Sequence, residues 1–123
     1  MAQQDMNPLE SGLNAYRGLQ KDIAKLQAGA GQANTQIMEN EMVLKELELL
    51  EDDAQVFKLI GPVLVKQELV EVKTNVSKRI EFIKNDISRL ESNVKTKEKE
   101  QEEVSKAIRS LQKTQAGAEG GGS

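Results

Sequence analysis

The chain has 123 residues and a formal net charge of −3, and 30% of its residues are charged. It contains one Tyr, two Phe and no Trp, Cys or His. A compact core normally uses more aromatic rings, and a composition rich in charged residues is typical of long solvated helices, so we expect an extended helical protein. Disulfides, thiolate metal sites and histidine chemistry are excluded. An acidic chain without a basic face is not expected to bind nucleic acid.

The first helix is predicted from about residue 8 to about residue 52. Asn7 is the expected N-cap, Pro8 the first helical residue and Glu10 the third, an order that suits the exposed N–H groups of a first turn. Apolar residues then alternate at spacings of three and four, which is the pattern of a coiled-coil seam. The members of this seam are Tyr16, Leu19, Ile23, Leu26, Ala30, Ala33, Ile37, Asn40, Leu44 and Leu47.

Two features of the first helix, Asn40 in the seam and the glycines beside it, each have two interpretations. Asn40 either fixes the register from a buried position or lies at the exposed edge of the seam. Gly29 and Gly31 weaken the helix by about 1 kcal/mol each relative to Ala. With their small neighbours they either allow close approach or bending, or they are a tolerated weak spot.

The second helix is predicted from about residue 67 to about residue 114. Its seam consists of Leu69, Val72, Val76, Ile80, Ile83, Ile87, Leu90 and Val94 and, after a break, Val104, Ile108 and Leu111. Lys97 and Gln101 occupy the seam at the break and weaken it.

The two seams fit each other when the chain folds back between the helices. Small residues of the first helix then meet large residues of the second, and Ile37 faces Ile80. The expected fold is mainly α, a long antiparallel coiled-coil hairpin with a short β-hairpin insert at the bend. The alternative is a parallel rod formed with another chain, in which Gly61-Pro62 would have no use. This domain covers residues 1–116, and the Gly-rich residues 117–123 are predicted to be a disordered tail.

The insert at residues 56–66 is predicted to form two β-strands, Val56–Ile60 and Val63–Lys66, joined by a turn at Gly61-Pro62. Both faces are apolar, and we expect Phe57, Leu59, Val63 and Val65 on one face and Val56, Ile60 and Leu64 on the other. An isolated hairpin with open edges is marginally stable and adhesive. These seven residues are therefore candidates for an interface in which hairpins of several chains join into a shared sheet or barrel.

Apolar residues outside the seams gather near the insert. They are Met38, Met42, Val43, Leu49, Leu50, Val70 and Phe82. We interpret them as the shoulders of the assembly surface, and Leu49, Leu50 and Phe82 join the interface candidates. The alternative is that they are ordinary surface apolar residues.

The many carboxylates form no catalytic pattern. An acidic cluster at the end of the first helix consists of Glu46, Glu48, Glu51, Asp52 and Asp53. It lacks the Gly turn and the ligand spacing of a calcium loop. We expect it to pair with basic residues of the second helix or of another subunit, among them Lys66, Lys73, Lys78 and Arg79. No catalytic residue, metal site or cofactor is predicted, and we do not expect an enzyme.

Two segments resemble a known family. "VFKLIGPVLVKQEL" at Val56–Leu69 and "ENEMVLKELELLEDDAQVFKL" at residues 39–59 are similar to the β class of prefoldin subunits. The resemblance covers nearly the whole chain in layout, and its specificity lies in the centre because coiled-coil arms resemble one another by composition.

The resemblance implies a subunit of a hetero-hexameric chaperone with two α-type and four β-type subunits. The five other subunits would join their hairpins to this one in a double β-barrel, from which six coiled coils extend. Such a chaperone holds unfolded proteins, notably actin and tubulin, without ATP and passes them to the cytosolic chaperonin.

The resemblance also implies that the coil ends grip the client. The candidates are Met6, Leu9, Leu13, Val104, Ile108 and Leu111. The alternative is that these residues close the coil, since Leu13 would face Val104 and Leu9 would face Ile108. Lys97 and Gln101, just inside the end, favour fraying.

A different class of function stays open at this point. The chain would then be a coiled-coil scaffold or tether that dimerises through its hairpin. The N-terminus lacks the pattern of a signal peptide, and the apolar stretch Leu59–Val65 is too short to span a bilayer. We therefore expect a cytoplasmic protein without a membrane partner.

Overall fold

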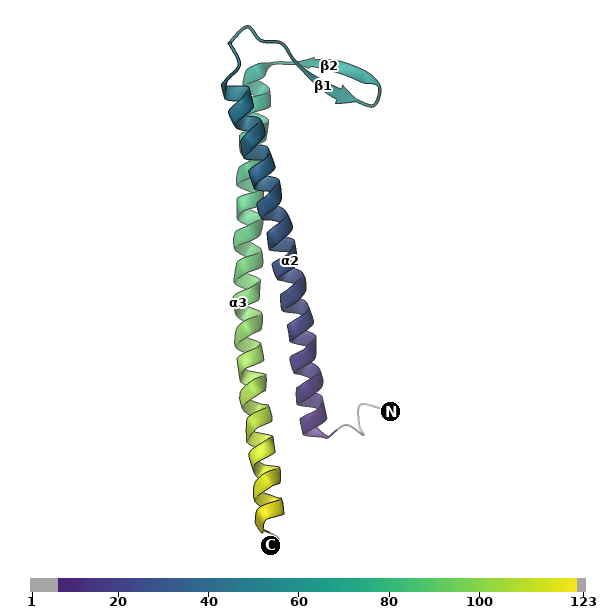
Figure 1. Cartoon of the computed structure of the whole chain (residues 1–123), viewed down its shortest axis with the longest axis vertical. Coiled ribbons are helices and arrows are strands. Elements are labelled where there is room, and N and C mark those ends of the chain that lie inside the picture. The colour runs from purple at the N-terminus through teal and green to yellow at the C-terminus, as the bar shows by residue number, and fades with distance from the viewer. Residues whose placement is uncertain (1–6, 122–123) are drawn as a thin grey trace. The chain divides into compact units, whose positions relative to one another are not determined.

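The computed structural model describes residues 7–121, and its elements follow the predicted order. Helix α2 (Pro8–Glu48) leads to strands β1 (Val56–Ile60) and β2 (Val63–Gln67), and helix α3 (Leu69–Gly121) follows (Figure 1). A mainly α fold with two long helices and a β-hairpin between them is confirmed.

The chain divides into two compact units. The hairpin unit is Gly29–Arg89, with the β-hairpin and the adjoining parts of both helices. The terminal unit consists of the described parts of Met1–Ala28 and Leu90–Ser123. Each unit therefore contains one segment of α2 and one segment of α3.

Helix α2 begins as predicted and ends earlier. The Asn7 Oδ1 accepts a hydrogen bond from the Glu10 backbone N–H at 2.8 Å, which confirms the N-cap. The helix ends at Glu48 and not near residue 52. Acidic residues are unfavourable at a helix C-terminus, and a turn in which the Ala54 N–H donates to the Glu51 carbonyl follows instead.

Helix α3 begins at Leu69, where the Val72 N–H donates to the Glu68 carbonyl at 3.0 Å. The helix continues to Gly121, past the predicted end near residue 114. Residues 117–121 are thus helical where the sequence predicted a disordered tail. Extending an existing helix needs no new nucleus, so α3 continues through this stretch in spite of its glycines.

The core of the hairpin unit is the predicted seam. The buried cluster consists of Ile37, Leu47, Leu69, Val76, Ile80, Ile83 and Ile87, and Ala33, Leu44, Val56 and Val72 pack against it. Every one of these residues except Val56 is a seam residue of α2 or α3. The antiparallel packing within this unit therefore follows from the spacing of three and four along both helices.

The seam of the terminal unit carries a polar layer. Ile23 and Ile108 are buried, and Leu19, Leu26, Leu90 and Val94 are half-buried, whereas Tyr16 is exposed. The Lys97 Nζ lies 3.8 Å from the Asp22 carboxylate, and the Gln101 amide donates to the Gln20 side-chain oxygen. The predicted weak part of the seam is thus bridged by polar contacts between the helices.

The glycines of α2 differ in what surrounds them. A Cβ at Gly12 would lie 3.0 Å from the Ile108 Cγ1, whereas a Cβ at Gly18 or Gly31 would meet nothing within 4 Å. Close packing therefore accounts for Gly12 alone among these three glycines. The structure supports the interpretation of Gly31 as a tolerated weak spot.

Gly18→Ala and Gly12→Ala are expected to change stability differently. Gly18→Ala removes a helix-weakening residue and should raise the free energy of unfolding by up to about 1 kcal/mol. Gly12→Ala has the same helical benefit, but the new methyl group would lie 3.0 Å from the Ile108 Cγ1, so the buried Ile108 has to shift. Thermal unfolding followed by circular dichroism should therefore give Gly18→Ala the higher midpoint. Equal midpoints would contradict the packing at Gly12.

Candidate assembly site

The β-hairpin is a two-stranded antiparallel sheet with a two-residue turn. Ile60 pairs with Val63, and the register continues to Val56 opposite Gln67. Gly61, the first turn residue, has φ +58°. A positive φ at this position suits the turns that match the twist of a hairpin, and Pro62 tolerates only the negative φ of the second position.

Gly61→Ala is expected to destabilise the hairpin by roughly 1–2 kcal/mol, because an L-residue with a Cβ is strained at this φ. Space is not the reason, since a Cβ there would meet nothing within 4 Å. Hydrogen exchange at the strand amides should become faster, while the amides of the helices keep their protection. Unchanged exchange in β1 and β2 would contradict this account of the turn.

The register corrects the predicted division of the two faces. Residues directly opposite each other in a ladder share a face, and partners across a two-residue turn have one odd and one even number. Val63 and Val65, opposite Ile60 and Lys58, therefore share the face of Val56, and Leu64 shares the face of Phe57 and Leu59. We call Phe57, Leu59, Leu64 and Lys66 the outer face, and Val56, Lys58, Ile60, Val63, Val65 and Gln67 the inner face.

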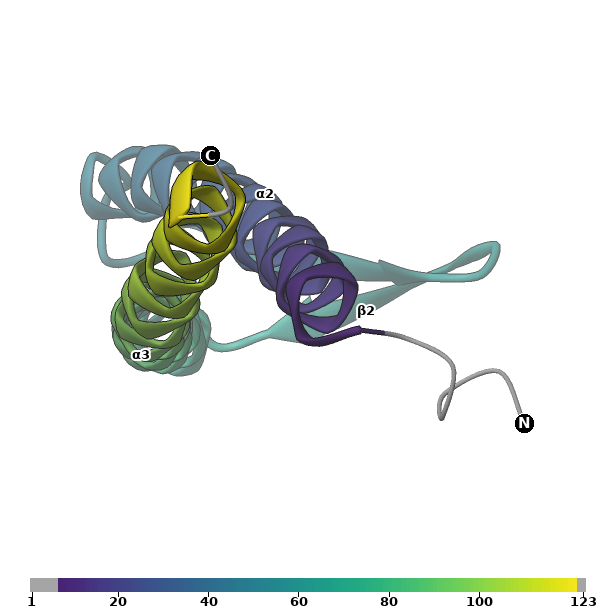
Figure 2. The ribbon, with the colours of Figure 1, turned by 90° about the horizontal axis from the view of Figure 1, so that it is seen from below.

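Apolar side chains are exposed over most of the hairpin. Leu59 on β1 is 66% exposed and its partner Leu64 is 64% exposed. Phe57, Ile60, Val63 and Val65 are also exposed, and only Val56 is half-buried, against the core of the hairpin unit. The tip of the hairpin projects away from the helices of its own unit (Figure 2). In the described chain nothing covers these residues.

The edges of the sheet are open as well. The sheet contains only β1 and β2, so each strand has one edge without a partner among residues 7–121. Free edges with apolar side chains are templates for pairing with another strand. The hairpin can therefore pair with a strand of another chain at either edge.

The shoulder residues are exposed too. They are Met38, Met42, Val43, Leu49, Leu50, Val70 and Phe82, and Leu49 reaches 85%. All of them belong to the hairpin unit, as do the exposed residues of the hairpin. Among the large apolar side chains that are described as exposed, only Tyr16 lies in the terminal unit. The exposed apolar surface is thus concentrated around the insert.

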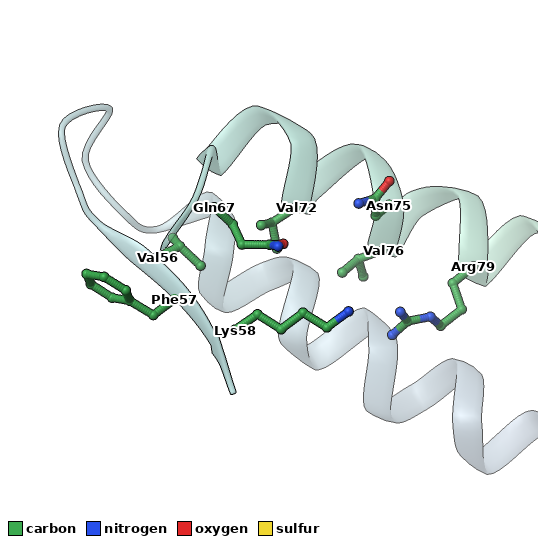
Figure 3. Close-up of a pocket in the computed structure, with 8 residues that line it drawn as sticks. All are labelled: Val56, Phe57, Lys58, Gln67, Val72, Asn75, Val76 and Arg79. Atoms are coloured by element: carbon green, nitrogen blue, oxygen red, sulfur yellow. The ribbon is translucent and has the colours of Figure 1, made fainter. Parts of the chain in front are cut away.

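A groove lies between the inner face of the hairpin and α3, and sequence reasoning missed it. Its lining includes Val56, Lys58, Gln67, Val72, Val76 and Arg79. The charged ends of Lys58 and Arg79 point toward each other across the groove (Figure 3). One feature of the sequence points to this groove: Lys58 is a charged residue among the apolar residues of β1.

The acidic cluster has no basic partner in the described chain. Asp52 and Asp53 share a groove with Lys66 and Lys73, yet the ion pairs among residues 7–121 include none of the five cluster residues. The predicted pairing with the second helix is therefore not formed within the chain. Pairing with another subunit stays a prediction.

The candidate client-binding residues lie in the terminal unit. Ile108 is 9% exposed, and Leu9, Leu13, Val104 and Leu111 are half-buried. Met6 lies outside the described residues. None of the five described residues is exposed in this structure, and their role in client binding stays a prediction.

The described residues hold no group of three or more acidic side chains that could bind a metal ion. None of the described helices is long and apolar enough to cross a bilayer.

Comparison with known proteins decides the family. The family profile "Prefoldin subunit" matches residues 10–115. This chain belongs to the prefoldin subunit family. It is 47% identical over 113 residues to prefoldin subunit 6 of Arabidopsis thaliana, covering 89% of this chain and 88% of the relative.

Other relatives agree. Prefoldin subunit 6 of Homo sapiens is 39% identical over 112 residues, covering 91% of this chain and 87% of the relative. The protein of the same name from Saccharomyces cerevisiae is 38% identical over 101 residues, covering 82% and 89%. The predicted resemblance to prefoldin subunits is confirmed, and all three relatives carry the name prefoldin subunit 6.

A solved structure has the same fold. The prefoldin beta subunit from Thermococcus strain KS-1 aligns with a TM-score of 0.77 at 23% identity, covering 88% of this chain and 96% of that chain. The family profile and the relatives show that the chain is a prefoldin chaperone subunit, and this solved structure shares its fold of two helices and one hairpin. Prefoldin subunits are chaperones and not enzymes, and membership implies assembly with other prefoldin subunits.

Proposed function

We propose that this chain is one subunit of a cytoplasmic, hetero-hexameric chaperone that works without ATP. Its five neighbours are two α-type and three further β-type prefoldin subunits. The complex captures unfolded proteins of the actin and tubulin class at its coil ends and transfers them to the cytosolic chaperonin. No nucleic acid, membrane or cofactor takes part.

One observation carries the proposal. Six apolar side chains of the hairpin are exposed on a two-stranded sheet with open edges. Hairpins from several chains remove such edges when they join into a closed barrel. The interface consists of Val56, Phe57, Leu59, Ile60, Val63, Leu64 and Val65, with Leu49, Leu50 and Phe82 as its shoulders.

The closed coil end has to open before it can bind a client. A holdase needs reachable apolar groups that are not contiguous enough to cause self-aggregation. Beyond the polar layer at Lys97 and Gln101 only a short apolar stretch holds the helices together, so this end opens at low cost. Opening exposes Leu9, Leu13 and Leu111, and several arms around one client add their weak contacts through effective concentration.

A disulfide across the coil end tests this step. The chain has no Cys, and a Cβ at position 12 would lie 3.0 Å from the Ile108 Cγ1. The variant with Gly12→Cys and Ile108→Cys, placed in the assembled complex, should close the end when oxidised. We expect the oxidised complex to bind denatured actin at least about twofold more weakly than the same complex after reduction.

The control is Gly12→Cys alone, which carries a thiol at the same position but cannot form the cross-link. Its binding of denatured actin should not depend on oxidation. Equal binding by the oxidised and reduced double variant would rule out client capture through opening of this coil end.

A further inference from the structure

The groove beneath the hairpin brings two cations together without an anion. Lys58 comes from the inner face of β1 and Arg79 from α3, and their charged ends point toward each other (Figure 3). The ion pairs among residues 7–121 include neither side chain. Two like charges that converge in one groove repel each other, and a carboxylate between them would turn the repulsion into attraction.

Arg79 makes one long hydrogen bond and keeps most of its hydrogen-bonding capacity. Its Nη1 donates to the Asn40 Oδ1 at 3.4 Å, and the Asn40 Nδ2 donates to the Gln36 carbonyl at 2.7 Å. Asn40, a half-buried seam residue, therefore contacts one end of the guanidinium. A guanidinium has five N–H donors in a planar fork, so the donors left over suit a carboxylate that binds with both oxygens.

The groove has an apolar wall beside these charges. Val56, Val72 and Val76 line it, and the Gln67 amide adds a polar group at one end. Lys58 and Arg79 are both exposed in the described chain, so an ion pair at this site becomes strong only when a neighbouring chain covers the groove and excludes water. A carboxylate on an ordered strand of that chain supplies both the charge and the cover.

We propose that Lys58 and Arg79 form a docking site for an acidic side chain of the neighbouring prefoldin subunit whose strand pairs with the free edge of β1. This inference rests on the proposed assembly. A residue on that strand directly opposite Lys58 lies on the inner face, because opposite residues share a face. Its carboxylate then points toward Arg79, which lies across the groove from Lys58.

The two cations add a selectivity that the apolar residues do not provide. Exposed leucines and valines provide adhesion to any apolar strand, and a slip by one residue would still bury apolar groups. A cation that requires a carboxylate penalises neighbours and registers without one. The site thus selects which subunit lies beside β1 and in which register.

Charge reversal in the assembled complex tests the site. Lys58→Glu and Arg79→Glu together should weaken incorporation of this chain into the complex by about tenfold or more at low salt, with a smaller difference at high salt. The matched control is Lys95→Glu, which reverses another exposed charge on α3 outside the groove and should leave incorporation unchanged. Circular dichroism checks that the helical content is unchanged.

A carbodiimide cross-link identifies the partner. This reagent joins a lysine amine directly to a carboxylate that it contacts, and mass spectrometry then locates the link. A link from Lys58 to an Asp or Glu in a strand of a neighbouring subunit is the expected result. Links from Lys58 only to client protein or chaperonin would overturn the proposal.

The two proposals fail in different ways. If the wild-type chain does not assemble with other prefoldin subunits, the proposed function is wrong. If the wild-type chain assembles and the Lys58 and Arg79 double variant assembles equally well with the same salt dependence, only the docking site is wrong.

Discussion

Phe57→Asp combined with Leu59→Lys is expected to abolish the assembly of this chain with other prefoldin subunits while its helical content stays the same. Both side chains lie on the outer face and are exposed in the isolated chain. Their burial in a shared sheet contributes roughly 3–6 kcal/mol together, which corresponds to a hundredfold or more in affinity. The new charges add the cost of burying ions in an apolar interface. Size-exclusion chromatography of the reconstituted complex measures the loss.

The matched control adds the same two charges elsewhere in the hairpin unit. Ser88→Asp and Asn85→Lys alter exposed positions of α3, so assembly should be unaffected. Normal assembly of the Phe57 and Leu59 variant would disprove the role of the outer face. A loss of helical content in that variant would show instead that the hairpin supports the coil.

Ile80→Ala is expected to lower the free energy of unfolding by about 2–4 kcal/mol, because it leaves a cavity in the buried cluster. Ile80 is only 7% exposed and belongs to that cluster. Ala is the better helix former, so the loss reports on packing between the helices and not on helix propensity. Urea unfolding of the full chain, followed by circular dichroism, gives the difference.

Phe82→Ala, two residues away, is the control. It should leave the stability of the isolated chain nearly unchanged and weaken assembly instead. Phe82 is 65% exposed, so its removal should change the stability of the isolated chain by less than about 0.5 kcal/mol. As a shoulder residue it should weaken assembly. If Phe82→Ala destabilises the isolated chain as much as Ile80→Ala does, the division between core and assembly surface is wrong.

The seams were predictable because they depend on spacing along one helix. Alternation of three and four places Ile37, Ile80 and Ile87 on faces that can be read without knowing the partner. The N-cap at Asn7 was predictable for the same reason, since its contacts are local. The helix ends were less predictable. The sequence predicted an end of α2 near residue 52, whereas α2 ends at Glu48, and acidic residues are unfavourable at a helix C-terminus.

The division of the hairpin faces was wrong although both strands were placed correctly. Odd and even numbers alternate between faces along one strand, but pairing across a two-residue turn joins odd numbers to even ones. Val63 therefore belongs with Ile60, and Leu64 belongs with Leu59. The register of the pairing decides the faces, and a strand-by-strand reading of residue numbers omits it.

The groove could not be found from the sequence. Lys58 and Arg79 lie on a strand and a helix that are separated by the turn and by β2, and only the packing of the hairpin against α3 brings them together. Asn40 was correctly singled out as a seam residue. Its partner Arg79 depends on the register between α2 and α3, which spacing gives only to within a turn.

The most direct test of the proposed assembly is the native mass and composition of the complex recovered from cell extract through a tag on this chain. We expect a discrete particle of six small coiled-coil chains that contains one copy of this chain and five other prefoldin subunits. A homodimer, or a complex with one large filament protein, would contradict it and leave the hairpin as a simple dimerisation element.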